Sequence, residues 1–395
     1  MRTLRENKIN FYKNELNFRK IAQELYKDNA TEHSIYICDL TKVQRQFELW
    51  QDCLPNIKPY YAVKTNNDAL VVKTLAELGA GFDCASVEEM QMVLEAGVTG
   101  DRIIFAHPCK PLSHLQYAQQ HQINISTVDT EFELFKLKQH FPNSDIVLRF
   151  RSDAKICGWP LGKKFGCEAQ TDTAALILLA RSLQLKIAGT SFHVGCECED
   201  LEAFVRALST ARELYDVGKM LGYDMNFVDI GGGYHGGNNE FFKKIAKTIS
   251  SSLDLYFGNE PIKCISEPGR YFVEAAFTLV CKITGKREMR NALGQLESIM
   301  YFINDGKYGS FIDTGRDFSN VMYFSENHLE QQKYKTTIWG PTCDSTDKIV
   351  DNLYLPRLHR GDLLAFPNMG AYTLCLASKF NGIPLPKVVY YQQQN

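Results

Sequence analysis

KPYYAVKTN, residues 58–66, joins a short aromatic and β-branched run to a lysine at the point where the run ends. The residues Thr65–Asp68 favour a turn and a helix cap, and the amphipathic stretch 69–78 favours a helix. We therefore expect Lys64 where a buried strand opens into a loop. A partly desolvated lysine at that position has a lowered pKa and a free amine suited to Schiff-base chemistry. The simpler interpretation is a solvent-facing lysine just past a strand end.

Outward from this stretch, strand-like and helix-like segments alternate. The strand-like runs are Tyr60–Val63, Gly81–Ala85, Ile103–Ala106, Asn124–Asp129, Asp145–Phe150, Ile187–Val194, Phe227–Ile230 and Ile262–Ser266. The amphipathic segments between them are 69–78, 87–96, 112–121, 131–140, 173–183, 201–221 and 241–256. This alternation predicts an α/β fold with a parallel sheet and helical crossovers. Eight such units in about 230 residues predict a closed (β/α)8 TIM-like barrel, with an open doubly wound sheet as the alternative.

The pattern of predicted elements changes after about Tyr271. The runs 275–284, 298–303, 335–339, 362–366 and 387–391 are strand-like but lack regular helical spacers, and turn residues separate them. They predict a C-terminal antiparallel β-sheet or β-barrel domain. The run 34–38 can join this sheet, which predicts a barrel over residues 38–275 and a β domain built from 1–37 together with 276–395.

Composition excludes several classes of protein. The 395 residues carry a formal net charge of −2, which points to neither nucleic acid nor an anionic membrane surface as a partner. Neither a secretory signal at the Met1 end nor a membrane-spanning stretch is expected from the apolar pattern. The twelve cysteines are scattered without a CxxC pair, so we expect free thiols in a reducing, cytoplasmic compartment and no metal site.

Charged and histidine side chains follow the predicted barrel strands. In a TIM-like barrel, the residues at the carboxyl ends of the strands line one mouth, where active sites lie. Because charged residues are rarely buried without partners or purpose, an active site explains them better than a purely structural ring of ion pairs. The residues at these positions are Lys64, Asp83, His107, Arg149, His193, Gly231, Gly232, Gly233, Glu267 and Arg270.

The segment VDIGGGYHGG, residues 228–237, follows the seventh predicted strand. Its GxGxxG pattern is weak evidence for a dinucleotide site, because that motif normally opens the first strand–helix unit. After the seventh barrel strand, a glycine loop with Arg270 can instead hold one phosphate. A lysine amine and a phosphate cradle in one mouth suggest pyridoxal phosphate, with Glu267 as the acid for the pyridine nitrogen and His193 stacked on the ring. The alternative for His193 is a satisfied core histidine.

These motifs carry a resemblance to a known family. The sequence closely resembles the eukaryotic ornithine decarboxylases, of the alanine-racemase-like fold type of pyridoxal-phosphate decarboxylases, from about Ser34 to Asn381. The matching stretches are YYAVKTN, GFDCAS, RIIFAHPCK, KKFG, SFHVG, DIGGG, EPGRY, NDGKYGSF, IWGPTCDSTD and NMGAYT. The order of EPGRY and WGPTCDS is highly specific.

The resemblance implies a role for each matching position. It implies that Lys64 and His193 are catalytic and that Cys343 protonates the substrate Cα after carbon dioxide leaves. It implies a polar network of Asp83, Glu89 and Arg149 around Lys64. It implies cofactor binding by Lys64, Asp83, Arg149, His193, Cys196, Gly232, Gly233, Glu267, Gly269, Arg270 and Tyr372. It implies substrate binding by Tyr308, Arg316, Asp317, Asp344 and Phe380, with Asp317 and Asp344 holding the distal ammonium.

Two positions depart from the family pattern. The family usually has HVGSG, with a serine that binds phosphate, where this chain has Cys196. A thiol is a weaker hydrogen-bond donor, which predicts lower phosphate affinity. The family usually has a tyrosine where Arg316 precedes Asp317, and a cation there opposes a cationic substrate unless it points away.

The implied function is the carboxy-lyase reaction that converts L-ornithine to putrescine and carbon dioxide in polyamine biosynthesis. The alternatives are decarboxylation of another basic amino acid, arginine or lysine, and a non-catalytic homologue that resembles the antizyme inhibitors. Retention of Asp317 favours ornithine, because relatives that act on arginine often carry glutamate there. The resemblance further implies a homodimer with active sites at the subunit interface, and antizyme as a possible partner.

Overall fold

The structure is a computed structural model that describes residues 8–27, 32–312, 317–327 and 331–394. The chain forms two compact units. Val43–Phe272 is called the barrel unit here, and Met1–Lys42 together with Val273–Asn395 is called the β unit. The domain boundaries expected from the sequence stay a prediction, because compactness alone does not show which segments fold on their own.

Eight parallel strands close into a barrel within the barrel unit. Their order around the barrel follows the chain, and the last strand pairs with the first through Ile265 and Lys58, which closes the ring. The predicted closed barrel is therefore confirmed, and the open-sheet alternative is wrong. The strands are β3 (Ile57–Ala62), β4 (Gly81–Cys84), β5 (Ile103–Phe105), β6 (Ile125–Val128), β7 (Asp145–Arg149), β9 (Lys186–Ser191), β11 (Phe227–Asp229) and β12 (Lys263–Ser266).

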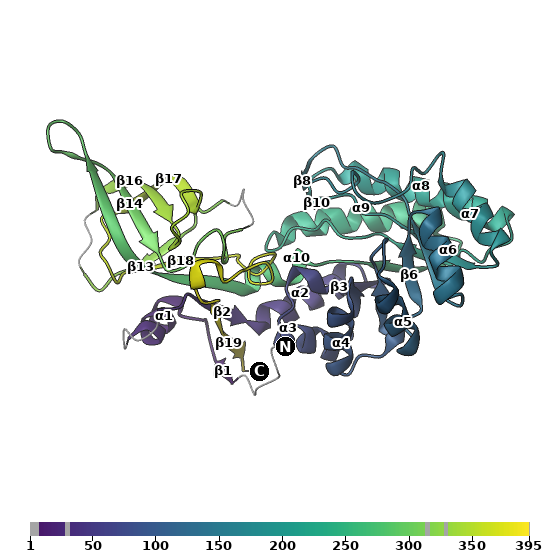
Figure 1. The fold of residues 1–395 in the computed structure, drawn as a ribbon, viewed down its shortest axis with the longest axis horizontal. Helices are drawn as coiled ribbons and strands as arrows, with labels where there is room; N and C mark the ends of the chain where they lie inside the picture. Colours follow the sequence, from purple (N-terminus) through teal and green to yellow (C-terminus); the bar gives the residue numbers. More distant parts are fainter. Residues whose placement is uncertain (1–7, 28–31, 313–316, 328–330, 395) are drawn as a thin grey trace. The chain divides into compact units, whose positions relative to one another are not determined.

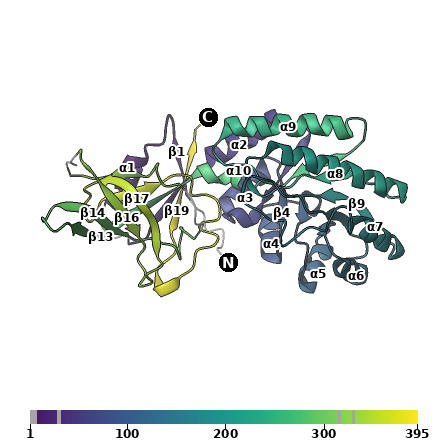
Figure 2. The same cartoon turned by 90° about the horizontal axis from the view of Figure 1, so that it is seen from above.

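Helices precede, connect and follow the barrel strands and lie outside them (Figure 1 and Figure 2). Side-chain caps begin several of them: Asp68 accepts the Leu70 N–H at 3.0 Å, and Ser86 accepts the Glu89 N–H at 3.3 Å. Each such cap is worth about 1 kcal/mol and fixes the residue at which a strand-end loop becomes a helix. The helices are α2 (Leu40–Cys53), α3 (Ala69–Glu77), α4 (Val87–Glu95), α5 (Leu112–Gln120), α6 (Glu131–His140), α7 (Thr173–Ser182), α8 (Leu201–Met220), α9 (Asn239–Phe257) and α10 (Arg270–Val273).

The interior of the barrel is a packed core. Alternate residues of the strands point inward, and Tyr60, Ile104, Val147, Phe227 and Ile265 form one buried cluster there. Since these side chains fill the interior, ligands bind at the mouth rather than within the ring.

The β unit is a sheet in which antiparallel pairing predominates among the described strands. The long strand β13 pairs antiparallel with β2, β14 and β18, whereas β19 pairs parallel with both β1 and β2. The predicted incorporation of the 34–38 run into this sheet is confirmed. The strands are β1 (Ile9–Tyr12), β2 (Ile35–Asp39), β13 (Phe277–Arg290), β14 (Leu296–Ile303), β15 (Met322–Phe324), β16 (Lys333–Trp339), β17 (Lys348–Pro356), β18 (Leu363–Phe366) and β19 (Lys387–Gln393).

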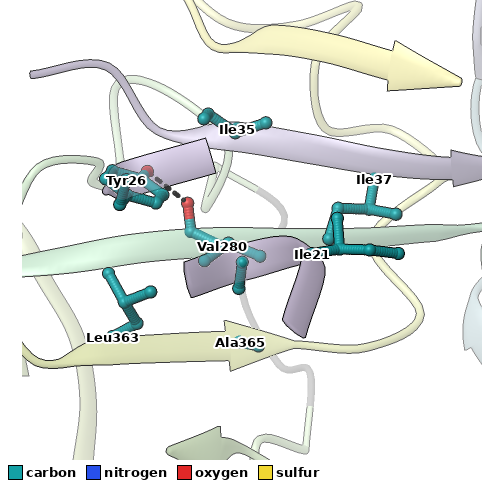
Figure 3. Close-up of a cluster of buried hydrophobic side chains, with 8 residues drawn as sticks. Ile21, Tyr26, Ile35, Ile37, Val280, Leu363 and Ala365 are labelled. Atoms are coloured by element: carbon teal, nitrogen blue, oxygen red, sulfur yellow. Dashed lines mark hydrogen bonds between the residues drawn. The ribbon is translucent and has the colours of Figure 1, made fainter. Parts of the chain in front are cut away.

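Helix α1 (Phe18–Tyr26) covers one face of this sheet (Figure 3). Its Ile21 and Tyr26 pack with Ile35, Val280 and Leu363. The Tyr26 hydroxyl donates a hydrogen bond to the Val280 carbonyl oxygen at 3.1 Å, which satisfies a polar group inside an apolar cluster.

Several elements were not expected from the sequence. They are the helices α1 and α2, the strands β1, β15 and β17, and a ribbon of β8 (Cys157–Trp159) with β10 (Cys196–Cys198). The ribbon strands are too short to show an alternating pattern, and their partners lie far apart in sequence. Among the described residues, no helix combines the length and apolar character needed to cross a membrane.

Candidate active site

Lys64 follows β3 in a short turn, Val63–Thr65, at the mouth of the barrel. Its Nζ lies 2.5 Å from Oδ2 of Asp83, which is fully buried in β4. The Lys64 side chain remains 45% exposed. The Asp83 carboxylate therefore holds the Lys64 amine from the buried side, and the amine remains accessible to a ligand at the mouth. Lys64 thus lies at the end of a strand, as predicted.

A second acid, Glu89, lies in the first turn of α4. Its Oε2 accepts the Ala85 N–H at 2.6 Å, so the side chain closes the loop between β4 and the helix. Burial raises the pKa of Glu89, while the bond from Ala85 lowers it and the neighbouring Asp83 raises it further. Glu89 thus lies beside the Lys64–Asp83 pair, as the resemblance implied.

A pair of buried acids, Asp229 and Glu267, lies where β11 and β12 end. Asp229 Oδ1 accepts the Gly231 N–H at 2.9 Å, and the two carboxyl groups hydrogen-bond to each other. Burial raises the pKa of both groups, and the charge of Asp229 raises that of Glu267 further, whereas the hydrogen bond from Glu267 lowers that of Asp229. A proton is therefore retained between them. Sequence analysis missed Asp229, although its place at the end of a barrel strand is the same signal that identified Asp83.

His193 lies just beyond β9 and carries no charge. Its Nδ1 accepts the Gly195 N–H at 3.1 Å, which leaves Nε2 as the protonated nitrogen of a neutral ring. Burial, together with the nearby cations Arg149 and Lys64, lowers the pKa of His193 to about 3. Gly232 leaves room for the ring, because a Cβ there would lie 3.1 Å from Nε2. The ring is a flat, neutral surface in the mouth.

Glycines line the loops next to this ring. Gly231 and Gly233 have positive φ angles of 62° and 118°, and a Cβ at Gly233 would lie 2.7 Å from the Gly195 carbonyl oxygen. A Cβ at Gly269 would lie 2.1 Å from Thr65 Oγ1. Arg270 follows with 7% of its surface exposed. The Gly195 backbone leaves no room for a Cβ at Gly233, and the Thr65 side chain leaves none at Gly269, so both points require glycine.

These groups fit pyridoxal phosphate. Glu267 Oε1 is buried and has no hydrogen-bond partner in the part of the chain that the structure describes, so an acceptor is available for a pyridine N–H. The glycine loop and the Arg270 guanidinium suit a phosphate dianion. Cys196 lies beside this cradle in β10, where burial raises the pKa of its thiol.

Four residues implied to act on the substrate lie together in the β unit. The Tyr308 hydroxyl donates a hydrogen bond to the Asp344 carboxylate, and the rings of Tyr308 and Phe380 are 4.5 Å apart. The N–H of the exposed Cys343 donates to Asn381 Oδ1 at 3.2 Å. The bond from Tyr308 lowers the pKa of Asp344, which keeps this acid ionised.

The remaining residues of the β unit are less closely connected. The hydrogen bonds of the Asp317 carboxylate within the described chain come from Ser319, and they lower the pKa of Asp317. Tyr372 is half-buried, with a φ angle of +52°. Arg316 lies outside the described residues, so its effect on the substrate stays a prediction.

A family model described as "Pyridoxal-dependent decarboxylase, pyridoxal binding domain" matches residues 40–274. The chain belongs to the pyridoxal-dependent decarboxylases. It is 46% identical to ornithine decarboxylase 2 of Drosophila melanogaster, over 98% of both chains. It is 38% identical to antizyme inhibitor 2 of Xenopus laevis, over 98% of this chain and 88% of that protein.

Solved structures agree with this assignment. The arginine decarboxylase of Paramecium bursaria Chlorella virus, bound to agmatine, superposes with a TM-score of 0.89 at 31% identity. The match covers 95% of this chain and all of that one. The resemblance to pyridoxal-phosphate decarboxylases inferred from motifs is therefore confirmed, and so is the cofactor class.

Proposed function

We propose that this protein decarboxylates L-ornithine to putrescine and carbon dioxide with pyridoxal 5'-phosphate held on Lys64. The observation that carries the proposal is the arrangement around Lys64. Its amine, a buried carboxylate, a neutral imidazole and an acid pair share one barrel mouth with a glycine cradle. Similarity to ornithine decarboxylase 2 of Drosophila melanogaster favours ornithine among the basic amino acids.

Each residue has a task that its chemistry supports. Asp83 orients the Lys64 amine, and the flat His193 ring packs on the face of the cofactor. Glu267 accepts the pyridine N–H, and the Gly233 loop with Arg270 holds the phosphate. When bound, pyridoxal phosphate supplies an electron sink for the negative charge left on Cα when carbon dioxide departs.

The substrate side of the reaction falls to the β unit. The ionised carboxylates of Asp344 and Asp317 suit the distal ammonium of ornithine through charge-assisted hydrogen bonds. The Cys343 thiol suits proton delivery to Cα, because a thiol has a pKa near the working range. We further propose that the enzyme is a cytoplasmic homodimer.

The test is release of carbon dioxide from ornithine, lysine and arginine by the purified protein with pyridoxal phosphate added. We expect ornithine to be the preferred substrate and Lys64→Ala to abolish release together with the visible absorbance of the bound cofactor. Preference for arginine or lysine would be consistent with the proposed mechanism but would reject ornithine as the substrate. If the protein neither binds the cofactor nor releases carbon dioxide, the proposal that it is a decarboxylase is refuted.

Antizyme binding is a second proposed function, favoured by an exposed apolar patch on neighbouring helices. Phe132 of α6 is 77% exposed, and Phe135 of α6 and Leu112 of α5 are about half exposed. Similarity to antizyme inhibitor 2 of Xenopus laevis supports the same partner. Phe132→Glu should weaken binding to purified antizyme without changing decarboxylation, and unchanged binding would reject this surface.

A further inference from the structure

Glu197 occupies an unusual position in the ribbon beside the phosphate cradle. It is the middle residue of β10 and has a φ angle of +50°, a conformation that favours glycine or asparagine. Gly195 and Cys198 hold this segment against the glycine loop, and the Cys198 N–H donates to the Gly233 carbonyl oxygen at 2.8 Å. The strained residue is therefore fixed at the cradle.

The Glu197 carboxylate faces the cationic group of the cradle. Its Oε1 lies 3.7 Å from Nε of Arg270. The Arg270 side chain is 7% exposed and that of Glu197 27% exposed, so water screens this pair only partly. The side chain extends over Gly158, where a Cβ would lie 3.0 Å from Glu197 Oε2. The β8–β10 ribbon thus leaves space for the Glu197 carboxylate to lie beside the Arg270 guanidinium.

A carboxylate and a phosphate on one guanidinium oppose each other. The phosphate needs the hydrogen bonds and the positive charge of Arg270, and Glu197 already draws on that charge. A phosphate dianion beside an ionised carboxylate adds like-charge repulsion, which a half-buried site strengthens. The phosphate is therefore bound more strongly when the Glu197 carboxylate turns away from Arg270.

We propose that Glu197 competes with the phosphate of the cofactor for Arg270 and so sets a weakened, reversible affinity for pyridoxal phosphate. This proposal rests on the proposed function, because it takes the cradle to be the phosphate site. Glu197 is a residue that tunes affinity and takes no part in the chemistry at Cα. Its effect is confined to ligands that carry a phosphate.

The test is a titration of the cofactor-free full-length protein with pyridoxal phosphate and, separately, with pyridoxal. Glu197→Gln removes the charge and keeps the backbone. We expect it to bind pyridoxal phosphate about tenfold more tightly and pyridoxal with unchanged affinity. Glu199→Gln is the matched control, because it removes the same charge from an exposed residue two positions along the loop and should change neither affinity.

A second variant separates charge from backbone strain. Glu197→Gly removes both, and the proposal expects a gain in phosphate affinity at least equal to that of Glu197→Gln. A gain in the glycine variant alone, or an equal gain for pyridoxal, would overturn the proposal, as would unchanged binding of pyridoxal phosphate to Glu197→Gln. If wild type and all variants fail to bind pyridoxal phosphate, the proposed function fails as well.

Discussion

At the scale of single residues, the barrel mouth combines acids that hold a proton with an imidazole that stays uncharged. Burial disfavours charge in every case, so it raises the pKa of Asp229 and Glu267 and lowers that of His193. The same desolvation thus keeps the His193 ring neutral for stacking. It also keeps a proton between Asp229 and Glu267, beside the site proposed for the pyridine nitrogen. The cations Lys64 and Arg149 oppose the rise for Glu267 without reversing it.

The acid pair predicts a pH dependence of stability. The pKa of Asp229 in the folded protein lies above its pKa in the unfolded chain. The contribution of Asp229 to the free energy of unfolding is therefore fully present below about pH 4 and is lost as the pH rises toward the raised pKa. Asp229→Asn keeps an oxygen for the Gly231 N–H and cannot ionise. Between pH 4 and pH 8 the variant should gain on the order of 4 kcal/mol relative to wild type, because folding raises the pKa of Asp229 from 3.8 to about 7.

Urea unfolding of the cofactor-free protein across this pH range measures that difference. Asp52→Asn, at an exposed position of α2, is the control and should show a constant difference from wild type. A constant difference for Asp229→Asn would contradict the assignment.

At the scale of elements, a buried ion pair fixes the loop after β5 to α6. Lys110 Nζ lies 2.9 Å from Glu133 Oε1 and donates to the Thr127 carbonyl oxygen at 2.7 Å, and both side chains are buried. Lys136 approaches the other Glu133 oxygen at 2.6 Å. One carboxylate thereby pairs with two cations, and Lys110 connects the loop after β5 with strand β6 and helix α6.

Removing that carboxylate should destabilise the barrel strongly. Glu133→Ala leaves Lys110 charged and buried without its partner, so we expect a loss of roughly 3–5 kcal/mol in the free energy of unfolding. Glu77→Ala, which removes an exposed ion pair with Lys73, should cost less than about 1 kcal/mol. Urea denaturation of both variants checks the contrast, and equal losses would show that the buried pair has no special role.

At the scale of the whole molecule, the residues assigned to the reaction divide between two units. Apart from Tyr372, the groups for the cofactor belong to the barrel unit, and Cys343, Asp344 and Tyr308 belong to the β unit. A homodimer in which each site takes Cys343 from the other subunit therefore predicts complementation. Lys64→Ala and Cys343→Ala should each have little activity alone.

When the two variants are mixed and allowed to exchange subunits, activity should return to about a quarter of wild type. Half of the dimers are then mixed, and each of those has one intact site. Decarboxylation assays before and after mixing measure this, with light scattering to confirm the dimer. Failure to regain activity in demonstrably mixed dimers would contradict sites shared between subunits.

Local sequence patterns predicted the eight barrel strands, the helices between them and the place of Lys64 at a strand end. Strand and helix periodicities, caps and turns are local properties, so they can be predicted without knowing what packs against them. The resemblance in motifs extended this to the family and the cofactor. The assigned roles of the site residues stay predictions.

Long-range pairing in the folded chain established closure of the barrel through β12 and β3, the β8–β10 ribbon, and the pairing of β19 with both β1 and β2. It also placed Asp229 against Glu267 and Glu197 against Arg270. These features join residues distant in the chain, and the charge of a buried group depends on its surroundings. No local sequence pattern encodes the long-range contacts or the charge states of the buried groups. Both arise only when the folded chain brings distant residues together.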